Sequence, residues 1–128
     1  MYQSPKPPSP TAILAQQCVR DSERWFGDTN APHSILHHTV ALCGEVGEFA
    51  NLVKKIDRGS LDPKDAKTRH EMTMELTDVY IYLLNLAGIL GVDLEAAYKV
   101  KRAENERRFT EQRKEREARK VAASDGHK

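Results

Sequence analysis

Two pairs of carboxylates are the residues in this 128-residue chain whose types and spacing could do chemistry. Glu45 and Glu48 lie in the stretch GEVGEFANLVKK, and Glu75 and Asp78 lie in ELTDVYIY. Side chains three residues apart on a helix are neighbours, and like charges in that position repel each other unless something compensates. Carboxylate oxygens are the ligands that hard divalent cations take. We therefore predict that these four residues bind Mg2+, with Mn2+ as the second choice.

Apolar residues at helical spacing accompany both acidic pairs. At about 100° per residue, five side chains fall within about 80° of one another and predict the buried stripe of the helix that carries Glu45. They are Leu42, Val46, Phe49, Val53 and Ile56. Glu45 lies just outside this arc and Glu48 lies further round. Glu75 and Asp78 flank an apolar stripe in the same way. If the two helices pack antiparallel, as their short connection favours, all four carboxylates converge at the edge of the core.

Four helical segments and no strand are predicted along the chain. They run from about 10 to 26, from about 32 to 58, from the start signal Asp62-Pro63 to Leu90, and from the cap Asp93 to about Lys120. Gly91 supplies the stop after the third helix. Short connections between long helices favour antiparallel neighbours, so we expect an all-α four-helix bundle.

The third helix is apolar on two faces. One stripe holds Met72, Val79, Leu83, Leu86 and Leu90, and the second holds Leu76, Tyr80 and Leu84. A helix of this kind packs against two partners, and in a small protein the second partner is often another subunit. The expectation is therefore a homodimer or a homotetramer.

The composition indicates a soluble protein, and its cysteines favour a location in the cytoplasm. The chain is 39% hydrophobic and 30% charged, with a formal charge of +1, so neither a membrane nor nucleic acid is expected as a partner. The longest apolar stretch, Val79 to Val92, is too short to cross a bilayer. Cys18 and Cys43 are not a close-spaced pair, which favours a reducing compartment, the host cytoplasm if the chain is phage-encoded. The expected organisation is a flexible proline-rich leader (1–9), one helical domain (10–120) and a disordered tail (121–128).

Other interpretations of the acidic pairs remain open on the pattern alone. A single ExxE on a charged helix is commonly a solvated face. A di-iron site needs a histidine three residues after a glutamate on two helices, and here those positions hold Asn51 and Asp78. His37 and His38, on the same helix as Glu45, are expected at the helix surface or beside a ligand rather than as ligands themselves.

Two longer stretches carry a family resemblance. LCGEVGEFANLVKK, together with ELTDVYIYLLNLAGILGVDLEAAYKVKRAENERRF, resembles the MazG-type all-α nucleoside triphosphate pyrophosphatases, in particular their short bacterial and phage forms. The likeness runs from about Leu36 to Phe109. It implies a hydrolase of nucleotide metabolism that cleaves (d)NTPs between the α and β phosphates, giving (d)NMP and pyrophosphate. Such an enzyme depends on Mg2+ and sanitises nucleotide pools.

The resemblance also implies roles for individual residues. All four carboxylates would be metal ligands, and Glu48 would in addition accept the proton of the attacking water. Lys101, Asn105 and Arg108 lie within about 60° on the fourth helix and match the family's basic face toward phosphate and sugar. Further substrate contacts are predicted at Lys54, Tyr82 and Trp25.

The chain departs from the family where the base is recognised. Relatives that favour deoxycytidine nucleotides carry a tryptophan late in the helix with ExxE, and the corresponding residues here are VKKI. An alternative is therefore a pyrophosphatase specific for dUTP or dCTP. A second alternative is a non-enzymatic nucleic-acid-binding or interaction module, since residues 99–120 hold ten bases against five acids.

Overall fold

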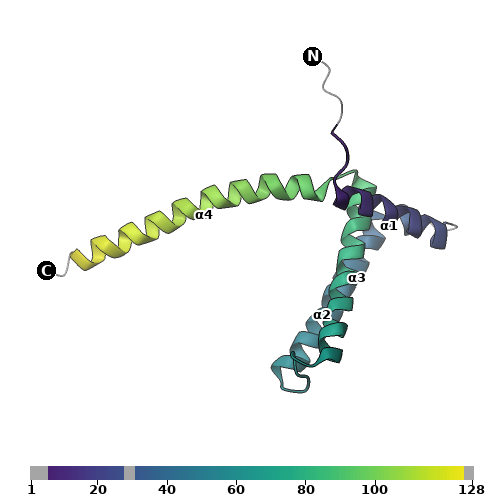
Figure 1. Ribbon diagram of the computed structural model, residues 1–128, viewed down its shortest axis with the longest axis horizontal. Helices are drawn as coiled ribbons and strands as arrows, with labels where there is room; N and C mark the ends of the chain where they lie inside the picture. Colours follow the sequence, from purple (N-terminus) through teal and green to yellow (C-terminus); the bar gives the residue numbers. More distant parts are fainter. Residues whose placement is uncertain (1–5, 28–30, 126–128) are drawn as a thin grey trace, which may run out of the picture. The chain divides into compact units, whose positions relative to one another are not determined.

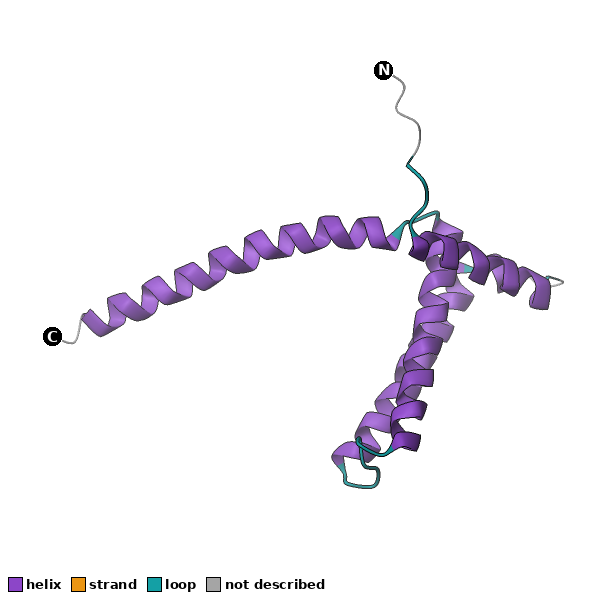
Figure 2. Cartoon of the chain, in the orientation of Figure 1, coloured by secondary structure: helices purple, strands orange, loops and turns teal. Residues whose placement is uncertain are grey.

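The computed structural model describes residues 6–27 and 31–125, which contain helices and no strands (Figure 1; Figure 2). The elements are α1 (Pro10–Phe26), the 3-10 helix η1 (Ala31–His33), α2 (Ile35–Asp57), α3 (Ala66–Leu90) and α4 (Leu94–Asp125). The chain divides after Asp93 into two compact units, the first holding α1 to α3 and the second holding α4. The predicted all-α class and its four helices are confirmed.

Local side chains define the helix ends. Ser9, Ser34 and Asp65 stand at the starts of α1, α2 and α3, and each accepts a hydrogen bond from the backbone N–H three residues on, at 3.1, 3.0 and 3.0 Å. These bonds satisfy amide groups that have no partner within the helix. α3 ends at Gly91, whose φ of 66° is the left-handed conformation that glycine adopts at little cost.

Three predicted boundaries differ from the structure. The second helix begins at Ile35 rather than at Pro32, because Pro32 belongs to η1. The third begins at Ala66, because Asp62 closes a turn instead: its carboxylate accepts a hydrogen bond from the backbone N–H of Lys64 at 2.8 Å. α4 continues to Asp125, beyond the predicted end. Residues 1–5 of the predicted leader and 126–128 of the predicted tail lie outside the described residues.

The first unit is built around the antiparallel pair α2 and α3, and α1 packs against the C-terminal part of α3 (Figure 1). Six of the buried or half-buried residues of α2 are spaced alternately four and three apart and form one seam. They are His38, Leu42, Glu45, Phe49, Leu52 and Ile56. This spacing keeps one seam of a helix directed at a long partner helix. Glu45 therefore lies within the seam.

The predicted buried stripe of α2 is wrong in two of its five members. Val46 is 49% exposed and Val53 is 42% exposed, whereas Leu52, which the stripe omits, is buried. The prediction assumed that the most apolar arc of the helix faces the core. The antiparallel contact with α3 turns the helix so that Leu52 faces inward instead.

Close backbone packing joins α1 to α3. A Cβ atom on Gly88 would lie 2.6 Å from Cγ2 of Val19 and 2.8 Å from the backbone oxygen of Ala15, so only glycine permits this approach. Leu84 and Ala87, in the same part of α3, are buried. The two partners that the apolar faces of α3 predicted are thus α2 and α1 of the same chain. Several members of the predicted stripes stay exposed: Leu76, Tyr80, Leu83 and Leu90.

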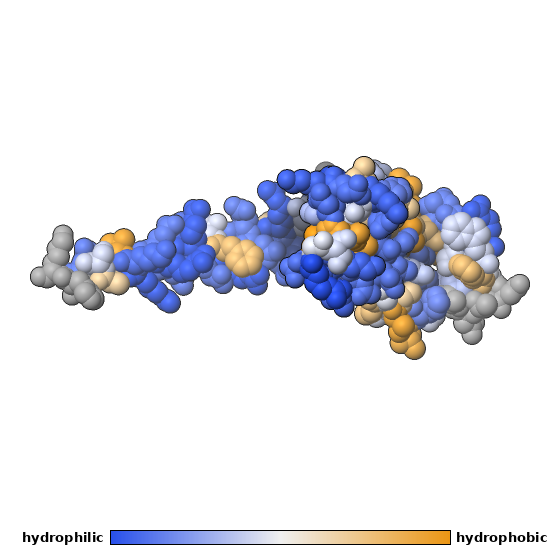
Figure 3. All heavy atoms as spheres, turned by 90° about the horizontal axis from the view of Figure 1, so that it is seen from below, coloured by the Kyte–Doolittle hydropathy of each residue, from blue (hydrophilic) through white to orange (hydrophobic). Residues whose placement is uncertain are grey.

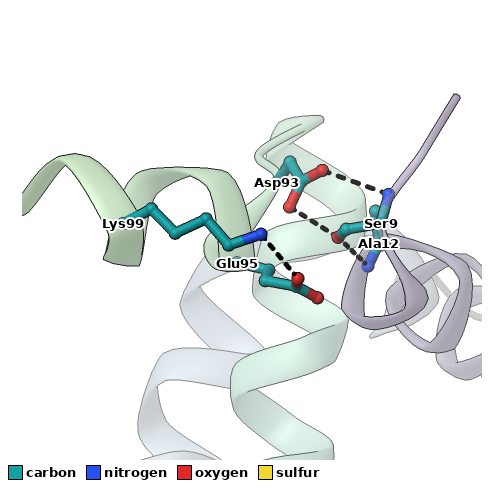
Figure 4. Close-up of polar contacts among 5 residues, drawn as sticks. All are labelled: Ser9, Ala12, Asp93, Glu95 and Lys99. Carbon is teal, nitrogen blue, oxygen red and sulfur yellow. Dashed lines mark hydrogen bonds and ion pairs between the residues drawn. The ribbon is translucent and has the colours of Figure 1, made fainter. Parts of the chain in front are cut away.

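Asp93 ties the end of the first unit to the start of α1 (Figure 4). Its carboxylate accepts hydrogen bonds from the hydroxyl of Ser9 at 2.7 Å and from the backbone N–H of Ser9 at 3.3 Å. Ser9 also caps α1, so a single serine fixes both the helix start and the turn after α3. The predicted leader therefore has a defined contact at its last residue.

α4 is a charged helix with side-chain pairs along its own surface. Ion pairs join Lys99 to Glu95 at 3.0 Å (Figure 4) and Arg107 to Glu111 at 3.6 Å. Such exposed pairs contribute at most a few tenths of a kcal/mol each, roughly. On the face shown in Figure 3, hydrophilic side chains dominate this helix and apolar ones are scattered.

No single helix among the described residues has the length and apolar character needed to cross a membrane. Only α3 and α4 taken together, as one broken span, meet those two requirements, and this is weak support for a membrane segment.

Candidate active site

Three carboxylates from two helices converge in the seam of the first unit. Glu45 comes from α2, Glu75 and Asp78 come from α3, and one oxygen of each lies within 4.8 Å of the others. All three side chains are half-buried. Among the described residues, no lysine or arginine forms an ion pair with any of them. The described part of the chain therefore provides no ion pair to compensate the negative charge of this cluster.

The surroundings of Glu45 raise the pKa of its carboxyl group. Burial raises it above the usual glutamate value, and the negative charges of Asp78, Glu75 and Glu48 raise it further, in that order. Partial burial and like charges both disfavour the ionised form of a carboxyl group. A bound cation would offset both effects, so the cluster suits a positively charged ligand.

Glu48, the fourth predicted metal ligand, is exposed and is not in the close cluster. The alternating seam of α2 explains its place: after Glu45 the next seam position is Phe49, so Glu48 turns toward solvent. It remains near enough for its charge to raise the pKa of Glu45. Its predicted roles as ligand and base stay predictions.

A pocket of about 530 Å³ lies among α1, α2 and α3. Its aromatic walls include Trp25, which is 63% exposed, and Tyr82. Tyr82 lies one turn beyond Asp78, and Asn85 follows three residues later, so the pocket continues the side of α3 that carries the carboxylates. Two residues predicted to contact substrate, Trp25 and Tyr82, are thus brought together at one cavity.

Three polar side chains in this pocket are buried: Ser22, which is 8% exposed, His38 and Asn85. His38 is 2% exposed, so of its two expected positions, at the helix surface or beside a ligand, the surface position is wrong. Its Nε2 lies 3.3 Å from the backbone oxygen of Pro32. Asn85 is 5% exposed and donates a hydrogen bond from Nδ2 to the backbone oxygen of Ile81 at 3.1 Å. Sequence reasoning gave Asn85 no role. The available signal was an amide within the apolar run VYIYLLNLAGIL.

The remaining predicted substrate contacts lie elsewhere on the chain. Lys54 is exposed in the last turn of α2. Lys101, Asn105 and Arg108 belong to α4, where Arg108 donates to the side-chain oxygen of Asn105 at 3.2 Å. This bond agrees with the shared helix face that their spacing predicts. Their contact with substrate stays a prediction.

Known proteins with similar sequences are nucleotide pyrophosphatases and a phage protein. The chain is 37% identical over 90 residues to dCTP pyrophosphatase 1 of Homo sapiens, covering 69% of this chain and 51% of that protein. The rat (Rattus norvegicus) protein of the same name is 36% identical over 90 residues, with the same coverage. The Gene 37 protein of Mycobacterium phage L5 is 38% identical over 66 residues, covering 52% of this chain and 58% of that protein. The chain spans about half the length of the dCTP pyrophosphatases it matches. No family model matches the chain.

Proposed function

We propose that this chain belongs to the MazG-like all-α nucleoside triphosphate pyrophosphatases. In this proposal it hydrolyses a (d)NTP between the α and β phosphates, giving the monophosphate and pyrophosphate, and so helps to sanitise nucleotide pools. The similarity to proteins named dCTP pyrophosphatase 1 supports a nucleotide pyrophosphatase activity in general. The single observation that carries the proposal is the convergence of Glu45, Glu75 and Asp78 within 4.8 Å of one another.

The donor set fits a hard divalent cation. All three groups are carboxylates, they come from two helices that pack directly, and no lysine or arginine within residues 6–27 and 31–125 forms an ion pair with them. Oxygen ligands of this type favour Mg2+ or Mn2+ over zinc. When bound, the cation would offset the charge of the triphosphate and polarise the phosphoryl group under attack. In this proposal Glu45, Glu75 and Asp78 hold it.

The chain's own residues would then orient the substrate and move a proton. Glu48 projects to solvent beside the cluster, where it can accept a proton from the water that attacks the α-phosphorus. The bond from that phosphorus to the bridging oxygen breaks, and pyrophosphate leaves. Lys54 and the basic face of α4 (Lys101, Asn105 and Arg108) are proposed to bind the phosphates and the sugar.

The pocket beside the carboxylates is proposed to hold the nucleobase. Flat aromatic side chains such as Trp25 and Tyr82 offer stacking surfaces to a base. The names of the relatives make dCTP the first substrate to test, with dUTP as its nearest alternative.

We further propose that the chain assembles with copies of itself into a homodimer or homotetramer. Leu36 and Val40 on α2, and Leu76 on α3, are large apolar residues that the single chain leaves exposed. Apolar surface of this kind is stabilised when a partner covers it. Light scattering coupled to gel filtration measures the molar mass of the assembly, and a monomeric mass would contradict this point.

A panel of nucleoside triphosphates assayed for pyrophosphate release with Mg2+ tests the proposed activity. We expect cleavage by the wild-type chain, and a loss of about 100-fold or more in the Glu75→Gln and Asp78→Asn variants, because each removes a ligand charge. Glu115→Gln, an exposed site on α4, is the matched control and should retain activity. Full activity in both ligand variants would contradict the site, and no cleavage by the wild type would contradict the function.

A further inference from the structure

Asn85 lines the pocket and carries a hydrogen-bond acceptor that no described residue satisfies. Its Oδ1 atom is buried and has no hydrogen-bond partner among the described residues. At the other end of the amide, one N–H of Nδ2 donates to the backbone oxygen of Ile81 at 3.1 Å. Rotating the amide by half a turn would bring two oxygens together at Ile81, so this bond fixes which end of the amide is left over. The atom of Asn85 left without a partner is therefore the acceptor Oδ1.

A buried acceptor without a partner destabilises the protein, and native structures rarely leave one without a reason. Asn85 is one of the residues that line the pocket. A ligand that brings an N–H group to Oδ1 would remove this free-energy cost. A ligand that brings a carbonyl oxygen to the same place would be repelled. The side chain can thus distinguish two ligands of the same shape.

The rest of the pocket indicates which kind of ligand this is. Trp25 and Tyr82 provide aromatic surfaces, and the volume of about 530 Å³ accommodates a planar heterocycle. Because Oδ1 is buried, a donor group that projects beyond the edge of a ring is better suited to reach it than one within the ring. An exocyclic amino group projects in this way, whereas a ring N–H does not.

From these observations we infer that Asn85 is a specificity-determining residue that accepts a hydrogen bond from the exocyclic amino group of a nucleobase in this pocket. Cytosine carries such an amino group at the position where uracil and thymine carry a carbonyl oxygen. Asn85 therefore selects cytosine nucleotides over uracil nucleotides. This inference rests on the proposed function for the identity of the ligand as a nucleotide.

The test compares kcat/KM for dCTP, dUTP and N4,N4-dimethyl-dCTP, which keeps the cytosine ring but has no amino hydrogen. We expect the wild type to prefer dCTP over each of the other two by about tenfold or more, the range in which a lost hydrogen bond discriminates between substrates. In the Asn85→Leu variant, the kcat/KM for dCTP should fall until it is within about threefold of the values for dUTP and N4,N4-dimethyl-dCTP. Asn51→Ala removes an exposed amide from α2 and should keep the wild-type preference.

The outcomes separate this inference from the proposed function. Pyrophosphate release with equal efficiency on dCTP and its dimethyl analogue would overturn the role of Asn85 while leaving the enzyme class intact. An unchanged preference in Asn85→Leu would do the same. If the Asn85→Leu variant does not fold, the kcat/KM values of the wild type for dCTP and N4,N4-dimethyl-dCTP decide whether the amino hydrogen is recognised. If the wild type cleaves no nucleotide, calorimetry with dCMP and dUMP decides: tighter binding of dCMP supports the inference, and equal or absent binding overturns it.

Discussion

Replacing Glu45 by glutamine should make the metal-free protein more stable, although it removes a residue of the proposed active site. Glu45 is the only carboxylate that α2 contributes to the close cluster, and its oxygen lies within 4.8 Å of those of Glu75 and Asp78. Glutamine keeps the shape and removes one charge, so two repulsive pairs disappear. If Glu45 served only to stabilise the fold, its replacement by glutamine would lower the stability instead.

The size of the effect follows from the spacing. Two unit charges 4.8 Å apart repel by about 0.9 kcal/mol in water and by about 3.5 kcal/mol at an effective dielectric constant of about 20. The three side chains are half-buried, so solvent screens them and the lower value applies. Removing two pairs should therefore raise the free energy of unfolding by about 1–2 kcal/mol at low ionic strength, which is a rise of several degrees in Tm.

The pH dependence has a defined sign. The folded-state pKa of Glu45 is raised, so the folded chain holds this proton more tightly than the unfolded chain does. Stability should therefore fall as the pH rises from below the unfolded glutamate pKa through the folded value. The variant lacks this group, so the difference in stability between variant and wild type should grow across that window.

Thermal unfolding followed by circular dichroism, with and without Mg2+, provides the assay. Mg2+ should raise the Tm of the wild type, because a ligand at about 100 times its Kd stabilises the state it binds by about 2.7 kcal/mol. The Glu45→Gln variant should lose most of this response. Glu115→Gln should behave like the wild type in both conditions. A lower Tm for Glu45→Gln without Mg2+ would contradict the repulsion among the three carboxylates, and an equal response to Mg2+ would contradict Glu45 as a ligand.

Three further substitutions test the fold that positions the site. Gly88→Ala should destabilise the chain by about 1–3 kcal/mol in denaturant unfolding, since the new Cβ would lie 2.6 Å from Val19, and an unchanged midpoint would contradict the close packing of α1 on α3. Ser34→Ala removes the cap of α2 and should cost about 1 kcal/mol in the same assay, whereas Ser34→Asp should restore most of the loss. The backbone N–H of Thr68 lowers the pKa of Asp65, so the stability that Asp65 contributes is present above the unfolded aspartate pKa and is lost as the pH falls through the folded value. Asp65→Asn should remove that part of the pH dependence in melts at acidic pH, and identical pH profiles for variant and wild type would argue against it.

Much of the local structure follows from short-range patterns. Capping residues and helical periodicity, which can be recognised directly in the sequence, predict the bounds of α1, the end of α3 at Gly91 and the all-α class. The pairing of ExxE with ExxD likewise indicates that carboxylates from two helices meet, and three of the four do so.

Features that depend on how one helix is rotated against another cannot be predicted from the sequence pattern. The arc of α2 that faces α3 is set by the contact between the two helices, so the predicted stripe included Val46 and Val53, and Glu45 was expected at the edge of the seam. The pocket is formed by side chains from three helices, and the importance of Asn85 emerges only when its two amide atoms can be told apart by their neighbours.

The central claim is that the carboxylate cluster supports attack of water on the α-phosphorus of a nucleoside triphosphate. The most direct measurement is the position of the isotope after the chain hydrolyses dCTP with Mg2+ in water labelled with heavy oxygen, determined by phosphorus NMR or mass spectrometry. We expect the label in dCMP and unlabelled pyrophosphate as the other product. Label in pyrophosphate, release of orthophosphate with dCDP, or an absence of hydrolysis would contradict it.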